Sequence, residues 1–289
     1  MTVSDDSHDP VMVREVIGFL GGRGTVVDMT LGAGGHAEAL LSAGVGTLVG
    51  IDRDPRALAL AGDRLAAFGG RFHPVRARFS EVDEDIVEGP VDGVLFDLGV
   101  SSMQLDQPER GFSFREAGPL DMRMGDDGPT AADLVNELPE AELADLIFEY
   151  GQESKSRRIA AAIVRARSRA PIQGTDELAG IVVGAVGRRP GGPHPARRTF
   201  QALRIAVNRE IEELAASLPQ AVDLLAPGGR VVVIAYHSLE DRIAKRTFRE
   251  DGRLAVLTKK PLRPSQAEVE ANPRSRSAKL RAAELVEAA

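Results

Sequence analysis

The chain has 289 residues, of which 43% are hydrophobic, so it can bury the core of one large domain or of a domain that carries a smaller one. It contains no cysteine, which excludes disulfide scaffolds and thiolate metal sites. No apolar run approaches the roughly 20 residues of a membrane span, and the residues before Val11 are polar and acidic, unlike a signal peptide. We therefore expect a cytoplasmic protein that does not act on a membrane.

The formal net charge of −7 averages two unlike parts of the chain. Residues 1–153 carry 29 acidic side chains against 11 basic ones, whereas residues 154–209 carry 12 basic side chains and only two acidic ones. A further basic run extends from Arg242 to Arg263. A polyanion can bind to such stretches. A solvated helical face explains the charge equally well, so charge alone leaves both interpretations open.

The first hundred residues predict strands that alternate with helices. Apolar runs indicate strands at residues 25–29, 47–51, 71–76 and 93–96. Residues 36–42 and 54–68 have helical patterns, and Pro55 occupies a first-turn position that tolerates proline. This alternation predicts a parallel sheet that is covered by helices.

The alternation stops after Gln107. Helical patterns occupy residues 130–150, 154–169 and 175–186, and a loop rich in Gly, Pro and Arg follows. We therefore expect an inserted all-helical domain at residues 108–198, flanked by sheet-domain segments at residues 1–107 and 199–289.

The pattern after the insertion predicts a return to the sheet. Apolar residues from Phe200 to Leu214 recur at spacings of three and four, which predicts a helix. A Pro-Gly-Gly turn then leads into a strand at residues 230–236. Residues 254–257 and 280–285 fit a closing hairpin, although the second run fits a helix equally well.

Acidic residues end three of the predicted strands, namely Asp28, Asp52 and Asp97. Ligands of open parallel sheets bind at the carboxyl ends of the strands. The glycine-rich turn at residues 32–35 lets backbone approach a ligand, and Asp52, about 20 residues further on, can accept hydrogen bonds from ribose hydroxyls.

The spacing of the turn distinguishes between two classes of cofactor. Its Gly-x-Gly-Gly-His run lacks the Gly-x-Gly-x-x-Gly spacing that packs a helix onto a pyrophosphate. Three carboxylates would repel phosphates and attract a sulfonium and an ammonium group. The pattern favours a methyltransferase that uses S-adenosylmethionine, and a nicotinamide oxidoreductase is the alternative. Taken singly, Asp28 and Asp97 also fit helix caps, His36 a capping or packing residue, and Phe79 a core residue.

Seven motifs make the interpretation specific, because they are distributed in order along nearly the whole chain. They are Asp28-Met-Thr-Leu-Gly-Ala-Gly-Gly-His36, Phe96-Asp-Leu-Gly-Val-Ser-Ser-Met-Gln-Leu-Asp106, Arg110-Gly-Phe-Ser-Phe114, Pro119-Leu-Asp-Met-Arg-Met124, Arg198-Thr-Phe-Gln-Ala-Leu-Arg204, His237-Ser-Leu-Glu-Asp-Arg242 and Asn272-Pro-Arg-Ser-Arg-Ser277. In this order they resemble the bacterial 16S ribosomal RNA cytosine-N4 methyltransferase family. Two departures are Gly151-Gln-Glu153, where Gly-Glu-Glu is usual, and Tyr236, where Phe is usual.

The resemblance implies a fold, a reaction and a set of site residues. The fold is α/β, a class I Rossmann-like methyltransferase sheet with the inserted helical domain as substrate-recognition domain. The reaction is N4-methylation of a cytidine in 16S rRNA, in the decoding region of the small ribosomal subunit, with S-adenosylmethionine as cofactor. The implied cofactor contacts are Gly34, Gly35, His36, Asp52, Phe79, Asp97 and Gln104.

For the chemistry we expect Asp97 to hold the amino group of the base, with Ser101 and Ser102 orienting it. The Asp/Asn-Pro-Pro-Tyr/Phe signature of amino-methyltransferases is absent, so a stacking aromatic must come from elsewhere. Phe112, Phe114 or Tyr236 can serve, and each fits a core position equally well. No cluster of ligands calls for a metal, and a homodimer is compatible with the resemblance. The alternatives are a methyltransferase acting on protein or a small molecule, and a non-catalytic ribosome assembly factor.

Overall fold

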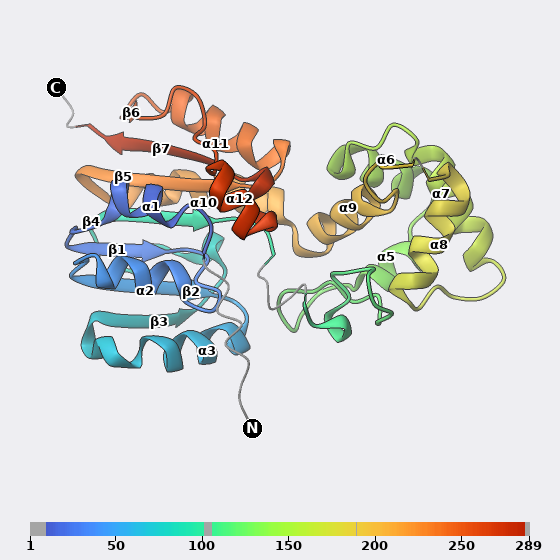
Figure 1. Ribbon diagram of the computed structural model, residues 1–289, viewed down its shortest axis with the longest axis horizontal. Helices are drawn as coiled ribbons and strands as arrows, with labels where there is room; N and C mark the ends of the chain where they lie inside the picture. Colours follow the sequence, from blue (N-terminus) through green and yellow to red (C-terminus); the bar gives the residue numbers. More distant parts are fainter. Residues whose placement is uncertain (1–9, 101–105, 189, 287–289) are drawn as a thin grey trace. The chain divides into compact units, whose positions relative to one another are not determined.

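A computed structural model describes residues 10–100, 106–188 and 190–286 (Figure 1). The chain divides into two compact units. The sheet unit comprises Met1–Gly99 and Ile211–Ala289, and the helical unit comprises Val100–Glu210. None of the helices in the described segments is both long enough and apolar enough to cross a membrane.

The sheet unit is built on seven strands in the order β3-β2-β1-β4-β5-β7-β6. Their bounds are β1 Thr25–Asp28, β2 Thr47–Asp52, β3 Phe72–Arg76, β4 Val91–Asp97, β5 Leu225–Ala235, β6 Leu254–Val256 and β7 Lys279–Leu285. Strands β1 to β5 are parallel, and β7 runs antiparallel to both β5 and β6. This confirms the predicted class I methyltransferase sheet. It also settles residues 280–285, which form a strand and not a helix.

Helices cover both faces of this sheet. Their bounds are α1 Val13–Leu20, α2 Gly35–Ser42, α3 Pro55–Leu65, α10 Glu210–Asp223, α11 Ser238–Glu250 and α12 Gln266–Ala271, with short 3₁₀ turns at Ala66–Arg71, Phe79–Glu81 and Pro273–Ser277. Helices α1, α2 and α3 pack with Val26 and Val232 in one core, and α10 and α11 pack with Val27 and Val233 in the other. Successive strand residues point to opposite faces, so both faces need apolar residues, and the strands read as continuous apolar runs.

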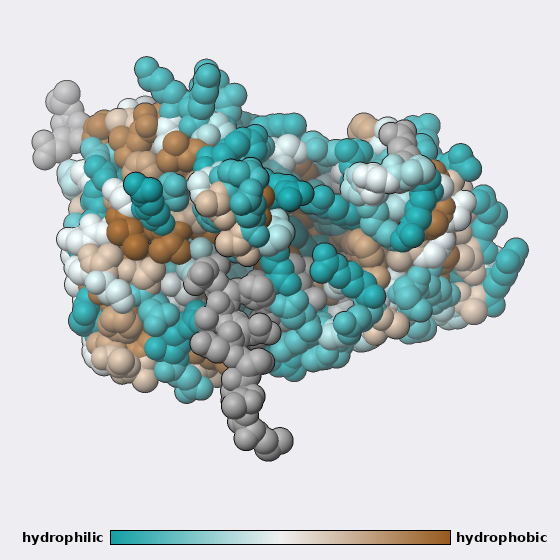
Figure 2. Space-filling view, viewed as in Figure 1, coloured by the Kyte–Doolittle hydropathy of each residue, from teal (hydrophilic) through white to brown (hydrophobic). Residues whose placement is uncertain are grey.

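The helical unit has a core of its own. Its helices are α5 Ala131–Glu137, α6 Glu140–Gly151, α7 Ser156–Arg167, α8 Thr175–Val186 and α9 Arg197–Asn208, preceded by a 3₁₀ turn at Pro108–Arg110. Fully buried Ile147, Ile159, Leu178 and Leu203 bring α6, α7, α8 and α9 together. Figure 2 shows hydrophilic side chains over much of the molecular surface in this view.

The boundaries of the units differ from the predicted 108–198. Helix α9 belongs to the helical unit because Leu203 and Val207 are buried in that unit's core. The apolar pattern from Phe200 to Leu214 predicted one helix that returns to the sheet. Instead, α9 ends at Asn208 and α10 begins at Glu210, because Arg209 takes a left-handed conformation with φ 52° that interrupts the helix.

Candidate functional site at the strand ends

Asp28, Asp52 and Asp97 end the strands β1, β2 and β4, which are neighbours in the sheet. The strand order reverses around β1, so the carboxyl ends of these strands form the switch point where α/β proteins bind ligands. Thr30 connects two of the strand ends: its backbone N–H donates to Asp28 Oδ1 at 3.1 Å, and its Oγ1 accepts from the Asp97 N–H at 2.6 Å.

Asp52 shapes the glycine turn. Its Oδ2 accepts a hydrogen bond from the Gly32 N–H at 2.9 Å, and its Oδ1 accepts one from the Asp54 N–H at 2.8 Å. Each carboxylate oxygen can accept a second bond, which leaves acceptor capacity for ligand hydroxyls. Burial raises the pKa of the Asp52 carboxyl, and the two backbone donors act in the opposite sense.

Gly34 caps the N-terminus of α2 in a left-handed conformation with φ 79°. A Cβ atom on Gly34 would lie 3.2 Å from the Ala61 Cβ and from the Leu65 Cδ1 of α3. Gly35 is the first residue of α2. A glycine is therefore required at position 34 both for the backbone conformation and for the close approach of α3.

His36 lies between a carbonyl and the carboxylate of Asp97. The side chain of His36 is 5% exposed; its Nε2 lies 2.9 Å from the Val11 carbonyl oxygen and its Nδ1 lies 3.4 Å from Asp97 Oδ2. A carbonyl only accepts, so Nε2 carries a proton. The Nδ1 atom faces the carboxylate, so the buried ring lies directly against one of the two oxygens of Asp97.

The other oxygen of Asp97 is held by Tyr236. The tyrosine hydroxyl donates to Asp97 Oδ1 at 2.9 Å. Burial raises the pKa of the Asp97 carboxyl, while His36 and the Tyr236 hydrogen bond lower it and Glu240 raises it. The pKa of Tyr236 is raised by burial and by Asp97, so the phenol stays protonated and remains a donor.

Asp28 is the most deeply buried of the three acids. It is 1% exposed, and burial raises its pKa to about 6, with His36 acting in the opposite sense. The strand ends therefore concentrate carboxyl groups whose hydrogen-bond partners are backbone amides, Thr30, Tyr236 and the His36 ring. This set of groups fits a ligand with positive charge, as S-adenosylmethionine has, and opposes the phosphates of a dinucleotide.

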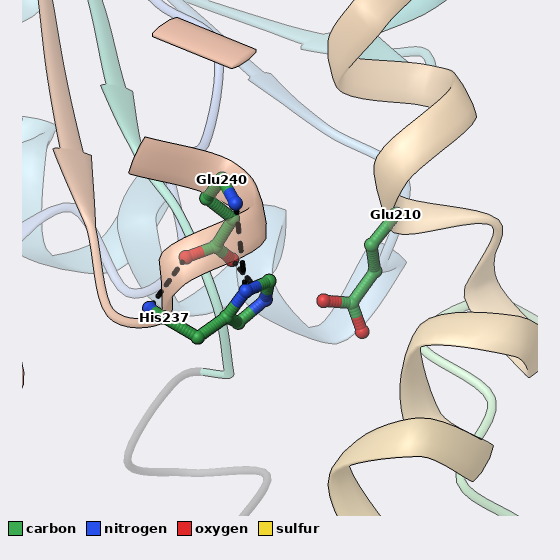
Figure 3. A group of neighbouring side chains, drawn as sticks. All are labelled: Glu210, His237 and Glu240. Carbon is green, nitrogen blue, oxygen red and sulfur yellow. Dashed lines mark hydrogen bonds and ion pairs between the residues drawn. The ribbon is translucent and has the colours of Figure 1, made fainter. Parts of the chain in front are cut away.

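His237 and Glu240 begin helix α11 as a capping pair (Figure 3). The Glu240 carboxylate accepts from the backbone N–H of Tyr236 at 2.7 Å and of His237 at 3.1 Å, and the Glu240 N–H donates to His237 Nδ1 at 3.5 Å. The cap is His237, and Glu240 satisfies amides that precede the helix.

The remaining predicted site residues fall into three groups. Phe79 is half-buried in a 3₁₀ turn and packs edge-on against Phe96 with ring centroids 5.9 Å apart. Ser101, Ser102 and Gln104 lie outside the described residues. The proposed stacking residues Phe112 and Phe114 instead pack in the helical unit, Phe112 buried in its core and Phe114 against Phe200 and His194.

Sequence reasoning missed two contacts of Asp97. The sequence signal for the Thr30 contact is weak, because it consists only of the position of Thr30 two residues after the strand-end acid Asp28. Tyr236 was considered as a stacking ring, whereas its hydroxyl holds Asp97. The signal for this contact was the departure itself, because a tyrosine stands where phenylalanine is usual in the resembling family.

Comparisons with known proteins identify the family of this chain. Residues 5–286 match the MraW methylase family. A ribosomal RNA small subunit methyltransferase H from Methylobacterium sp. (strain 4-46) is 51% identical over 314 residues, covering 99% of this chain and 93% of that protein. The protein of the same name from Azorhizobium caulinodans is 48% identical over 303 residues, covering 97% and 88%. This chain therefore belongs to the MraW methylase family, whose methyl donor is S-adenosylmethionine.

Proposed function

We propose that this protein transfers a methyl group from S-adenosylmethionine to the N4 amino group of a cytidine in 16S rRNA of the small ribosomal subunit. The observation that carries the proposal is Asp97, a half-buried acceptor at the β4 end that is fixed by Tyr236 on one oxygen and faces His36 on the other. The names of the relatives support ribosomal RNA as substrate. The cytosine N4 atom and the decoding region are inferred from the motif resemblance.

The residues that would hold the cofactor are those of the strand ends. Asp52 would accept from the ribose hydroxyls, Phe79 would pack beside the adenine, and Gly34 and Gly35 would let backbone approach. Both ring nitrogens of His36 already have partners, so we propose that His36 acts chiefly by positioning Asp97. The bound cofactor supplies an electrophilic methyl group on a sulfonium.

The residues of this chain would orient a weak nucleophile, the N4 amino group of cytosine. The N4 lone pair of cytosine is delocalised into the ring, and correct orientation can lower such a barrier by roughly 7–11 kcal/mol in favourable cases. Asp97 would accept a hydrogen bond from the amino group and aim it. N4 would take up the methyl group that the cofactor supplies, the cofactor's sulfur would keep the electron pair of the broken bond, and N4 would release one proton. Asp97 Oδ2, facing His36 Nδ1, is the place that we propose for this proton.

Transfer of labelled methyl from S-adenosylmethionine to small subunits from a strain that lacks this protein tests the proposal. We expect label in N4-methylcytidine after nucleoside mass analysis. Label in ribosomal protein, or no label, would contradict the proposed function. Asp97→Asn should abolish methylation and weaken cofactor binding only modestly, whereas unchanged turnover would remove Asp97 from the chemistry.

We further propose that the helical unit contributes an RNA-binding surface. On α7 and α9, Arg157, Arg158 and Arg197 are exposed and lack an ion pair among the described residues, whereas Arg198 lies 3.7 Å from Glu153. Arg197→Glu should therefore lower RNA affinity in a salt-dependent way, and more than Arg198→Glu does. Equal affinities of Arg197→Glu and wild type across salt concentrations would contradict this surface.

A further inference from the structure

A cavity of about 200 Å³ lies in the sheet unit where helix α11 meets strands β6 and β7. Four basic side chains line it, and none of its lining residues is acidic. They are Lys245, Arg249, Lys259 and Arg281. Phe248 and Val256 add apolar surface. The cavity shares no lining residue with the strand-end site, so the proposed methyl transfer does not account for it.

Arg281 is the buried member of this group. Its side chain is 8% exposed, and its Nε donates to Asp241 Oδ1 at 2.7 Å. This bond uses one of the five N–H donors of the guanidinium group. An anion in the cavity can accept hydrogen bonds from the others.

The other three cations are exposed and uncompensated. Lys245, Arg249 and Lys259 form no side-chain hydrogen bond or ion pair within the described segments. Arg246, on the same helix, is instead paired with Glu250 at 2.9 Å. The cavity therefore collects positive charge that the protein leaves unbalanced, which favours an anionic ligand.

The donor set identifies the chemical class of that ligand. Guanidinium groups form bidentate, charge-assisted hydrogen bonds with phosphate and carboxylate oxygens, and lysine adds a mobile point charge. We propose that this cavity binds a phosphate group of the RNA backbone, so that the sheet unit contacts the substrate at a second place. This inference rests on the proposed function, because it takes RNA as the source of the phosphate.

RNA binding by the full chain over a range of salt concentrations tests the inference. The triple variant Lys245→Gln, Arg249→Gln, Lys259→Gln should bind a 16S rRNA fragment at least about tenfold more weakly near 0.1 M salt, and the salt slope of its affinity should fall by about 1, as expected for the loss of one phosphate contact. Arg249→Gln alone should reduce the affinity and the slope in the same direction, but by less than the triple variant does. The matched variant Arg246→Gln removes the same charge from the same helix outside the cavity and should bind like wild type.

Two measurements separate the outcomes. Binding of S-adenosylhomocysteine by the triple variant checks that the sheet unit is folded. If wild type methylates and binds rRNA but the triple variant has the same affinity and salt slope, the cavity inference is wrong while the proposed function stands. If wild type neither binds nor methylates rRNA, the proposed function itself fails.

Titration with inorganic phosphate tests the source of the anion. Saturable phosphate binding that is lost in Arg249→Gln, together with weaker RNA binding, supports the inference. Phosphate binding that is lost in Arg249→Gln without any change in RNA affinity would overturn RNA as the source and leave a site for free phosphate.

Discussion

The hydroxyl of Tyr236 donates to the carboxylate that we propose as the acceptor of the reaction, and phenylalanine, which is usual here in the family pattern, has no such donor. A hydrogen bond to a charged group contributes about 1.5–3 kcal/mol. The bond favours ionised Asp97 and so lowers its pKa. Tyr236 is therefore a positioning residue that extends activity towards lower pH, if methylation needs the ionised carboxylate.

In Tyr236→Phe we expect the acidic limb of the pH–rate profile to shift to higher pH by about one unit. The reason is that loss of the hydrogen bond raises the pKa of Asp97, and 1.36 kcal/mol corresponds to one pKa unit. Methylation rates measured between pH 4.5 and 8 would show the shift. Tyr150→Phe removes the chain's other tyrosine hydroxyl, in the helical unit, and should leave the limb in place. An acidic limb that stays at its wild-type position in Tyr236→Phe would rule out this role.

Asp28 gives the protein a pH-dependent stability. Its pKa is about 6 in the folded protein and 3.8 as the ordinary value. Because the pKa of Asp28 is higher in the folded protein than in the unfolded chain, protonation of Asp28 favours the folded state. This contribution to stability is complete below pH 4 and is lost as the pH rises through 6. The difference of about two units corresponds to about 3 kcal/mol.

Asp28→Asn should consequently raise the free energy of unfolding by up to about 3 kcal/mol at pH 8 and change it little at pH 4. Urea denaturation at the two pH values measures both. Asp63→Asn, at an exposed position on α3, serves as the control and should have little effect at either pH. A destabilised Asp28→Asn protein at pH 8 would mean that the charge of Asp28 is compensated in the fold.

Individual strand-end residues could be predicted because strand ends follow from local pattern. Asp28, Asp52 and Asp97 each terminate an apolar run, and parallel strands bring such ends to one edge. The partners of Asp97 depend on tertiary structure. Tyr236 reaches Asp97 because β4 and β5 pair in a register that sets Asp97 opposite Ile234, two residues before the tyrosine. No local pattern encodes that register.

At the level of elements, the junction between the glycine turn and α2 is the most constrained. Gly34→Ala should lower stability by about 1–2 kcal/mol for the left-handed backbone alone, and the contacts at 3.2 Å with Ala61 and Leu65 should add to this loss. Gly62→Ala is the matched control. Position 62 lies inside α3 with no atom within 4 Å of an added Cβ, so alanine should stabilise the helix by up to about 1 kcal/mol.

Denaturation of both glycine variants in urea tests the argument. A Gly34→Ala protein as stable as wild type would show that the turn can rearrange. The cofactor affinity of Gly34→Ala should fall as well, because the turn carries the proposed contacts, while the affinity of Gly62→Ala should not change.

The type of an element was predicted well where its apolar residues recurred with a clear period. Predictions were poorer where the apolar pattern fitted more than one structure or continued across a helix boundary. Residues 280–285 fit a helix in isolation, yet they form β7 because their backbone groups pair with β5 on one side and β6 on the other. Residues 200–214 keep a helical period across the break at Arg209, because α9 and α10 bury their apolar faces in different cores. Periodicity identifies an apolar face but not the core that receives it.

The whole molecule combines two units, which have separate hydrophobic cores, with an uneven distribution of charge. Every buried residue of one hydrophobic cluster belongs to the helical unit, and the residues of the other two clusters belong to the sheet unit. Units with separate cores can unfold in separate transitions. A ligand that binds only the folded sheet unit should then stabilise that unit alone.

Calorimetry with and without S-adenosylhomocysteine tests this organisation. At a ligand concentration of 100 Kd the transition of the sheet unit should gain about 2.7 kcal/mol, and the transition of the helical unit should stay in place. Leu178→Ala, in α8, should destabilise the helical unit by about 2–5 kcal/mol. Leu218→Ala, in α10, should lower only the transition that responds to ligand. If both variants and the ligand shift one single transition, the two units unfold as one cooperative unit, and loss of the proposed RNA surface on the helical unit would then also cost the protein its cofactor site.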